Sequence, residues 1–304
     1  MDILRIIEYI VTEEYDQYPL LHFLKGHVKL STRIVQTLRH TKGSVLVNGE
    51  YARLVDKVSC GDKVKIALPE TTSPPLLWDI SLDIIFEDDD LLVINKPSGI
   101  SVHPTFNHPN GTLCNAVASY LTNKNNSSSV ARAVGRLDKV TSGVMIFAKN
   151  AYAASKLNGN LDKTYLAVVN GTTDESGFIE APIFRPDLNK TIRSVDSRGD
   201  YAFTTYKTLF HYNNMSAVEV KTETGRTHQI RVHFSHIGHA LVGDEMYGGI
   251  ATENISRAAL HCLKVSIIHP VTNEALTFRA PLPEDIKKEF EKNGISVDKL
   301  SLFC

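Results

Sequence analysis

One aspartate of the sequence stands in a setting that could make it a nucleophile. Asp138 lies in the stretch GRLDKVTSGVMIFAKN, residues 135–150, two residues after Arg136 and shortly before an apolar run. No histidine stands beside it to act as a base, and no second carboxylate is close enough in the sequence for an obvious acid–base pair. Such a carboxylate either acts alone as a nucleophile or caps the turn before a strand. The residues of this stretch leave both alternatives open.

A second group of reactive side chains lies in GRTHQIRVHFSHIGHALVGDEMYGG, residues 225–249. Arg226 and Arg231 flank His228, and the histidines that follow at three-residue steps are His233, His236 and His239. Imidazoles are common metal ligands, so a metal-dependent hydrolase is one hypothesis. The spacing matches no zinc motif, however, and no cysteine or carboxylate stands among these histidines. We therefore predict polar or structural histidines and no metal.

A serine hydrolase is a further alternative for which the sequence offers little. It has no Gly-x-Ser-x-Gly elbow, and Ser142 lies in Thr-Ser-Gly, an ordinary turn sequence. The glycines of GDEMYGG, residues 243–249, form no phosphate-loop pattern, and we interpret them as turns. We accordingly expect no serine nucleophile and no nucleotide cofactor.

The elements that must position these residues are mainly short β-rich runs. Between turns, the second part of the chain contains LDIIFEDDDLLVINKPSG, GVMIFAKN, KTYLAVVNG, AFTTYKTLF, SAVEVKTETG, LKVSIIHP and EALTFRAPLP. Helical candidates are fewer and lie over residues 111–123, 151–160 and 226–236. This pattern predicts an α+β fold with a mixed, mainly antiparallel sheet flanked by helices, rather than a doubly wound sheet.

The start of the chain predicts a smaller, separate unit of mixed α and β structure. Residues 5–11 predict a strand, and Ser31 is a plausible N-cap for a helix that continues to His40. The pair Asn48-Gly49, between alternating apolar residues, is a strong hairpin signal.

A Pro-rich stretch, PETTSPPLLWD, follows at residues 69–79 and marks the best domain boundary. We therefore expect a small domain over residues 1–68, a linker over 69–80 and a larger domain over 81–304.

The small domain is basic although the whole chain, with a net charge of −1, is not. Between residues 22 and 65 nine lysines and arginines stand against three carboxylates. A solvated helix face would explain this excess, and so would a module that binds the phosphates of a nucleic acid.

The composition is typical of a globular protein: 304 residues, 42% hydrophobic and 22% charged, the length of two domains. The four cysteines are far apart and suggest no disulfide framework; they are Cys60, Cys114, Cys262 and Cys304. The acidic N-terminus is a poor signal peptide, and no run approaches the ~18 apolar residues of a membrane span. We expect a reduced, cytoplasmic protein that is a monomer.

The stretch around Asp138 resembles the catalytic motif of RNA pseudouridine synthases of the Rlu type. That family's pattern is roughly His-Arg-Leu-Asp-x-x-Thr-Ser-Gly, followed by an apolar strand. Other blocks resemble the family in the right order over residues 81–283: EDDDLLVINKPSGISVHP, KTYLAVVNG, TGRTHQIRVHFSHIGHALVGDEMYG, LHCLKVSIIHP and APLP. Residues 1–68 resemble the S4-like RNA-binding domain that is often fused in front.

This resemblance implies an enzyme that isomerises uridine to pseudouridine in RNA and requires no cofactor. Asp138 would be its nucleophile, and Arg231 the basic residue that pairs with the aspartate. Tyr165 would stack on the uracil and assist removal of the proton from carbon 5. Core packing of Tyr165 and a phosphate contact or surface position of Arg231 are the simpler alternatives.

The resemblance also implies which residues contact the RNA. Arg136 would fill the space left by the extruded nucleotide or hold its phosphate, and a structural salt bridge is its alternative. The other residues expected to bind substrate are Lys163, Arg226 and His228.

The sequence departs from the family pattern at three places. Gly135 replaces the usual histidine before Arg-Leu-Asp, and Val140 replaces a common aspartate. The segment PLLHFL, residues 19–24, lacks the Arg-Leu-Asp-Lys opening typical of the S4-like domain. The third departure weakens the assignment of RNA contacts in the small domain.

The expected substrate is RNA, with large-subunit ribosomal RNA as the leading hypothesis and transfer RNA as the alternative. A catalytically silent RNA-binding assembly factor is a different class of protein. The joint presence of Asp138, Tyr165 and Arg231 argues against it.

Overall fold

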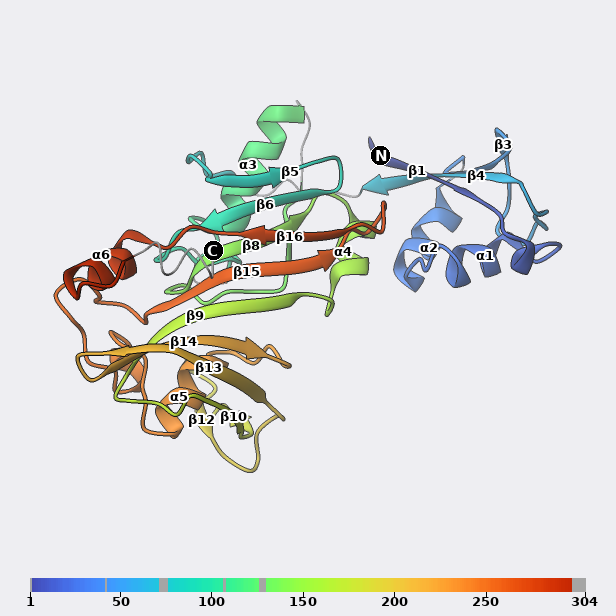
Figure 1. The fold of residues 1–304 in the computed structure, drawn as a ribbon. Coiled ribbons are helices and arrows are strands. Elements are labelled where there is room, and N and C mark those ends of the chain that lie inside the picture. The colour runs from blue at the N-terminus through green and yellow to red at the C-terminus, as the bar shows by residue number, and fades with distance from the viewer. Residues whose placement is uncertain (1, 42, 71–75, 106–107, 126–129, 297–304) are drawn as a thin grey trace.

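A computed structural model describes residues 2–41, 43–70, 76–105, 108–125 and 130–296 of the chain. The fold is α+β, as predicted, with a small antiparallel sheet near the N-terminus and a large mixed sheet after it (Figure 1). Residues 71–75 of the expected linker and Cys304 lie outside the described residues.

The small sheet has the strand order β1-β4-β2-β3. Its strands are β1 (Asp2–Ile10), β2 (Val45–Val47), β3 (Glu50–Tyr51) and β4 (Lys63–Glu70). The accompanying helices are η1 (Glu13–Tyr15), α1 (Leu20–Gly26) and α2 (Thr32–His40). Strand β4 runs two residues past position 68, where we expected the domain to end, because its last residues pair with Asp2 and Ile3 of β1.

Two local signals of the small domain are confirmed. The side chain of Ser31 accepts a hydrogen bond from the amide of Ile34 at 3.3 Å, which makes it the N-cap of α2. Asn48 and Gly49 join β2 to β3 with φ values of 51° and 90°. A two-residue hairpin turn with positive φ at both positions favours this pair of residues.

The large sheet has ten strands and the order β10-β13-β14-β9-β15-β8-β6-β5, with β16 beside β15 and β7 beside β8. Only the β8–β15 pair among these is parallel. The strands are β5 (Ile84–Glu87), β6 (Leu91–Lys96), β7 (Arg132–Val134), β8 (Ser142–Ala148), β9 (Asp162–Asn170), β10 (Ser176–Glu180), β13 (Phe203–Tyr212), β14 (Met215–Thr222), β15 (Leu260–Ile268) and β16 (Ala275–Arg279). Separately, β11 (Ile183–Phe184) pairs with β12 (Ser194–Val195).

Three helices of the large domain lie near the predicted positions: α3 (Leu113–Asn125), α4 (Ala151–Leu157) and α5 (Gln229–His236). Two more helices, η2 (Glu245–Tyr247) and α6 (Glu284–Lys292), lie where we predicted none. Helix α4 ends before the expected residue 160, and Gly159 follows with a φ of 80° that a right-handed helix does not allow. Within the described residues no helix is both long and apolar enough to cross a membrane.

Strands β8 and β15 approach each other closely at the centre of the sheet. Gly143 has a φ of 112°, and a Cβ atom at this position would lie 2.2 Å from the carbonyl oxygen of Cys262. Only glycine fits this contact, so the glycine after Thr141 and Ser142 lets the chain enter β8 directly beside β15.

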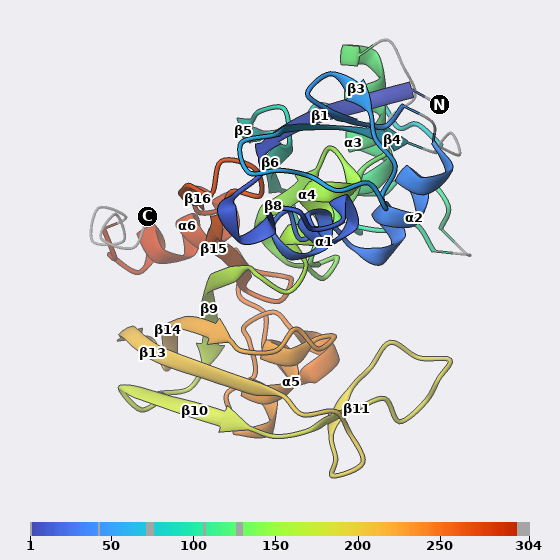
Figure 2. The same ribbon diagram turned by 90° about the vertical axis from the view of Figure 1, so that its right-hand side faces the viewer.

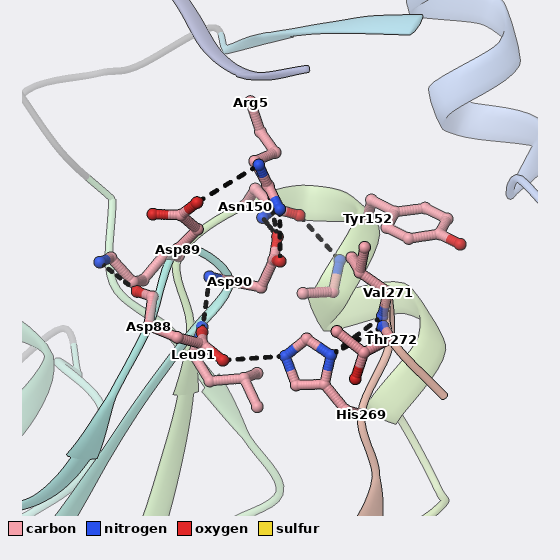
Figure 3. A network of polar contacts seen from close by, with 12 residues as sticks. Arg5, Asp88, Asp89, Asp90, Leu91, Asn150, Tyr152, His269, Val271 and Thr272 are labelled. Carbon is pink, nitrogen blue, oxygen red and sulfur yellow. Dashed lines mark hydrogen bonds and ion pairs between the residues drawn. The ribbon is translucent and has the colours of Figure 1, made fainter. Parts of the chain in front are cut away.

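A partly buried ion pair joins the two domains (Figure 3). Arg5 of β1 donates through Nε and one terminal nitrogen to the two oxygens of Asp90, each at 3.0 Å. The Asp90 side chain is 2% exposed and also accepts a hydrogen bond from Asn150 at 2.8 Å. Nearby, His269 Nε2 lies 3.0 Å from Asp88.

An aromatic contact reinforces this domain junction. The hydroxyl of Tyr9 in β1 lies 2.7 Å from that of Tyr152 in α4. The Tyr152 ring is 1% exposed and packs into the hydrophobic core of the small domain. Because a side chain of the large domain completes the core of the small one, the two domains are packed against each other (Figure 2).

Candidate active site

Asp138 lies in the loop between β7 and β8, at the centre of the large sheet. A capping aspartate accepts a hydrogen bond from the backbone of its own loop. Within the described residues the Asp138 carboxylate accepts no such hydrogen bond. Its side chain is 14% exposed and faces two basic residues. One oxygen lies 3.6 Å from a terminal nitrogen of Arg231 and 4.0 Å from Nε2 of His228.

The backbone of residues 138–141 is held at every carbonyl. The Asp138 carbonyl accepts the amide of Thr141 at 3.1 Å, and the Lys139 carbonyl accepts the amide of Gly99 at 2.8 Å. The Val140 carbonyl accepts a hydrogen bond from Arg257 at 3.0 Å. These hydrogen bonds hold the backbone of the loop in place and thereby position the residue that bears the Asp138 carboxylate.

Lys96, at the end of β6, is the main anchor of this loop. Its ammonium nitrogen is buried and donates to the carbonyl oxygens of Pro97, Lys139 and Thr141 at 2.9, 3.2 and 2.7 Å. Burial lowers the pKa of Lys96 to about 7, with Arg257 adding to the lowering and Asp138 opposing it. Only the ammonium form has three N–H donors for three carbonyls, so this geometry favours the charged side chain.

Arg231 is positioned by Asp244 rather than by Asp138. Its Nε and one terminal nitrogen each lie 2.7 Å from an Asp244 oxygen, a bidentate pair. The guanidinium also lies 4.9 Å from the centre of the Tyr247 ring. Burial would lower the pKa of Arg231, but the hydrogen bonds and charge of Asp244, with that of Asp138, outweigh it and raise the pKa.

His228 immediately precedes α5 and has an unusual backbone conformation, with a φ of 59°. Left-handed backbone is costly for a histidine and often marks a functional position. Its Nδ1 lies 2.7 Å from the hydroxyl of Tyr247. Burial lowers the pKa of His228, with the positive charge of Arg231 contributing and Asp138 opposing. A neutral imidazole is therefore placed beside the carboxylate.

Tyr165 projects from β9 beside Asp138, in a part of the sheet where β9 pairs with β15 opposite Cys262. The residue is 8% exposed, and its hydroxyl makes no hydrogen bond within the described residues. Burial, then the charges of Cys262 and Asp138, raise its pKa well above the usual value. The hydroxyl is therefore protonated at neutral pH and can donate a hydrogen bond to a molecule in the site.

One cavity of about 260 Å³ brings all seven predicted site residues together. Its wall comes from three segments, residues 135–141, 159–165 and 222–231, with Leu260. The predicted residues in that wall are Arg136, Asp138, Lys163, Tyr165, Arg226, His228 and Arg231.

Three of these residues form a basic rim. Arg136 is exposed and donates to the Thr227 hydroxyl at 3.3 Å, so it does not form the structural salt bridge that we considered. The Lys163 amine lies 3.2 Å from the Arg136 carbonyl oxygen, and burial lowers its pKa. Arg226 donates to the Tyr201 carbonyl oxygen and lies 3.5 Å from Asp200.

Gly135 begins this loop with a φ of 72°. A Cβ at this position would lie 3.0 Å from the Lys163 nitrogen, so a larger residue would meet both backbone strain and crowding. The glycine that departs from the family pattern therefore matches the local geometry.

Sequence reasoning did not identify Asp244, Tyr247 and Lys96 as parts of the site. The first two lie in GDEMYGG, which we interpreted only as turns, and Lys96 lies in the Asn-Lys-Pro turn. The family block that contains Asp244 and Tyr247 was a usable signal, but only the fold reveals that these side chains contact Arg231.

The histidines after position 228 do not converge on a metal site. His233 is fully buried between the Thr204 hydroxyl and the Ala181 carbonyl, and His239 lies 2.9 Å from the Asn170 carbonyl. Among the described residues, the three-residue group with metal-ligand spacing is Asp88, Asp90 and His269, whose Asp90 is occupied by Arg5 and Asn150. The 228–239 histidines therefore support no metal-dependent hydrolase.

Ser142 also belongs to the structural core. Its hydroxyl is 2.9 Å from Nδ1 of the buried His261 and accepts a hydrogen bond from Arg257. The serine is 3% exposed and is not part of the cavity wall, so it is not placed to attack a substrate.

Comparisons with known proteins identify the family of the chain. The family model described as RNA pseudouridylate synthase matches residues 90–236. The chain is 38% identical over 293 residues to "Uncharacterized RNA pseudouridine synthase YhcT" of Bacillus subtilis, covering 93% of this chain and 96% of the relative. It is 38% identical over 267 residues to "Ribosomal large subunit pseudouridine synthase D" of Xanthomonas campestris, covering 81% and 80%.

A solved structure shares the fold. Human RNA pseudouridylate synthase domain containing 4 aligns with a TM-score of 0.58 and 21% identity, covering 70% of this chain and 94% of that one.

Proposed function

The chain belongs to the RNA pseudouridine synthase family, an isomerase family, and we propose that it converts uridine to pseudouridine with Asp138 as its nucleophile. One observation carries the assignment of the nucleophile. Two carboxylates, Asp138 and Glu223, line the cavity, and Glu223 is exposed. Asp138 is the one that faces Arg231 and His228, and it is not used by its own loop.

The reaction is an internal rearrangement. The bond from ribose carbon 1 to uracil nitrogen 1 breaks, and a bond from the same ribose carbon to uracil carbon 5 forms. Carbon 5 loses its hydrogen as a proton, and nitrogen 1 gains one. Atoms and electrons therefore balance within the nucleotide, and a carboxylate nucleophile with a proton acceptor suffices.

Arg231 and His228 prepare the carboxylate. The guanidinium of Arg231 is held by Asp244 at 3.6 Å from Asp138, so it faces the carboxylate without a direct hydrogen bond to it. An oxygen that is not engaged in a short hydrogen bond keeps its lone pairs for attack. The neutral His228 beside it places no second positive charge on the nucleophile.

Tyr165 provides a ring next to the nucleophile. Its buried position suits stacking on the uracil. Because its pKa is raised, the hydroxyl does not act as a tyrosinate base at neutral pH. It instead donates a hydrogen bond to the base, or takes the carbon 5 proton while it passes its own proton to the Asp138 carboxylate in the same cavity wall.

The small domain supplies an additional RNA-binding face. Four exposed basic residues on or near its helices have no carboxylate partner within the described residues: Lys25, Lys29, Arg33 and Arg39. Lys29 also lies near Lys156 of α4, whose pKa is lowered by burial and by the charge of Lys29. Lys156 lies in the last turn of α4, and Gly159 of the cavity wall follows this helix in the chain.

Large-subunit ribosomal RNA is the proposed substrate, because relatives from three bacteria carry the name ribosomal large subunit pseudouridine synthase D. We place the reaction in the cytoplasm, where the free thiols of Cys60, Cys114 and Cys262 would stay reduced, and assign it to a monomer.

The test is release of tritium from carbon 5 of uracil in unmodified RNA, with wild-type protein and Asp138→Asn. Wild type should release tritium from large-subunit ribosomal RNA, and Asp138→Asn should release roughly a thousandfold less while binding the RNA equally. Release from transfer RNA alone would correct the substrate. Binding without release by wild type would make the protein a silent RNA binder, and release by both proteins would exclude Asp138 as nucleophile.

A further inference from the structure

A second cavity, of about 490 Å³, adjoins the active site. The two cavities share Gly225 and Arg226 in their walls. The wall of the second one includes residues of β11 and the chain that follows it. This part of the chain projects beyond the large sheet (Figure 2). A molecule that occupies the active site and extends past Arg226 would therefore enter this cavity.

The wall of the second cavity is strongly basic. Four arginines stand in it against one carboxylate, Asp200; they are Arg185, Arg193, Arg198 and Arg226. Guanidinium groups recognise phosphate with two parallel hydrogen bonds, which makes a group of them typical of a site for phosphorylated ligands.

Two of these arginines lack a counter-charge within the described residues. Arg185 donates to the carbonyl oxygen of Lys190 at 3.0 Å. Arg193 donates to the carbonyl oxygens of Thr191 and Ile192 at 2.6 and 3.0 Å. Their guanidinium groups are oriented by the backbone, and their positive charges are not neutralised.

The other two arginines are oriented by carboxylates. Arg198 forms a bidentate pair with Asp196 and stacks 4.5 Å above the centre of the Phe184 ring. Arg226 lies 3.5 Å from Asp200. The cavity is therefore preorganised, with two fixed arginines in pairs and two that remain available for an anion.

Arg193 connects this cavity to the reacting groups. Burial lowers its pKa, and the positive charges of Arg185 and Arg136 lower it further, while Tyr247 and Asp138 oppose this lowering. Its backbone amide donates to the hydroxyl of Tyr247 at 3.0 Å, and that hydroxyl contacts His228. Crowding of like charges beside the active site is unfavourable unless an anion lies among them.

We propose that the cavity lined by Arg185, Arg193, Arg198 and Arg226 binds phosphodiester groups of the RNA strand next to the target uridine. This inference rests on the proposed function, because it takes the RNA strand to be the molecule in the active site. Leu188, 78% exposed at the cavity wall, and Phe184 give the same strand an apolar surface for a ribose or a base.

The test measures RNA binding and tritium release separately for Arg185→Gln, Arg193→Gln and the double variant. Binding is followed by filter retention of labelled ribosomal RNA over a range of salt concentrations. Loss of one phosphate contact on a single strand should reduce the salt slope by about 0.7 and the double loss by about 1.4. We expect the double variant to lose at least about tenfold in affinity at low salt, more than it loses in the rate at saturating RNA.

Matched variants keep the outcome specific. Arg193→Lys retains the charge and should recover most of the salt slope. Lys288→Gln removes an exposed positive charge on α6, distant from this cavity (Figure 1), and should bind as wild type. Near-ultraviolet circular dichroism checks that each variant is folded.

The inference is overturned if the double variant keeps the wild-type affinity and salt slope. An equal loss for Lys288→Gln would also overturn it, because the effect would then be one of overall charge. The proposed function fails separately, if wild type binds RNA and releases no tritium; the salt slopes still report on the cavity in that case.

Discussion

Asp244 binds Arg231 through both carboxylate oxygens at 2.7 Å, while the remaining guanidinium nitrogen lies 3.6 Å from Asp138. Asp244 is not part of the cavity wall, but it sets the position of the positive charge beside Asp138, which is part of that wall. Both members of the Arg231–Asp244 pair are nearly fully buried.

We predict that Asp244→Asn lowers the rate at saturating RNA by about a hundredfold, because the displaced guanidinium of Arg231 no longer faces the Asp138 carboxylate. The unpaired buried arginine should also cost about 3–5 kcal/mol of unfolding free energy. Single-turnover tritium release and urea unfolding measure the two effects. The surface pair Glu253–Lys292 provides the control, since Glu253→Gln should change neither quantity appreciably. An Asp244→Asn protein with wild-type turnover would contradict the positioning role.

A second prediction concerns the loop anchor. Lys96→Met keeps most of the side-chain volume but removes three hydrogen bonds, two of them to the loop that carries Asp138. The rate at saturating RNA should fall about a hundredfold, with little change in RNA affinity. The amides of Gly99 and Thr141 should exchange hydrogen faster, which a purely electrostatic role of Lys96 would not cause. Lys288→Met, on exposed α6, should leave rate and exchange unchanged.

The third prediction separates the ring of Tyr165 from its hydroxyl. Tyr165→Phe keeps stacking but removes the hydroxyl, and we expect it to slow the reaction by about 10²–10⁴-fold if that group moves the carbon 5 proton. The isotope effect for deuterium at carbon 5 should then increase, because proton removal becomes rate-limiting. Tyr165→Leu should weaken binding of the uracil as well. A Phe variant with wild-type rate and isotope effect would restrict Tyr165 to stacking.

The pH dependence gives an independent check on Tyr165. Because burial raises its pKa, the hydroxyl stays protonated well past the usual pKa. Between pH 6 and 9 the wild-type rate should therefore not rise with the slope that a tyrosinate base would give. A rate that climbs about tenfold per pH unit, and loses that climb in Tyr165→Phe, would show that tyrosinate is the active form.

The fourth prediction concerns the domain junction. Arg5→Leu leaves the buried Asp90 without its cation, with Asn150 as a remaining side-chain partner. We expect a loss of about 2–3 kcal/mol in unfolding free energy and weaker binding of long RNA. In a double-mutant cycle, Arg5→Leu with Asp90→Asn should cost less than the sum of the single changes. Arg53→Leu, which breaks an exposed pair with Asp56, is the control for stability. Additive losses would mean that the pair does not couple the domains.

Local features such as a helix cap and a hairpin turn could be predicted from the sequence. Ser31 caps α2, and Asn48-Gly49 turns the hairpin, because each depends on residues within a few positions along the chain. The seven predicted site residues came from a resemblance in ordered blocks rather than from spacing. Their meeting in one wall follows from the central position of β8, β9 and β15 in the large sheet.

Contacts between residues far apart in the sequence could not be predicted. Arg5 and Asp90 are separated by 85 positions, and Lys96 reaches carbonyls 43 and 45 positions away. A single sequence gives no register between strands so far apart. Every residue has a backbone carbonyl, so residue types do not indicate which carbonyls accept a hydrogen bond from Lys96. The four arginines of the second cavity were likewise scattered charges until the chain around β11 and β12 placed them together.

The anchoring of residues 138–141 also determines what limits the reaction. Every carbonyl of that segment is already hydrogen-bonded, so we expect the loop that carries Asp138 to stay in place when RNA binds. The target nucleotide must therefore move out of its stack to reach Asp138. This movement costs roughly a few kcal/mol, and least in an unpaired loop. Speed on different uridines is then governed by local melting of the RNA. Warming that loosens a stem should bring its paired uridines toward the rate of those in loops.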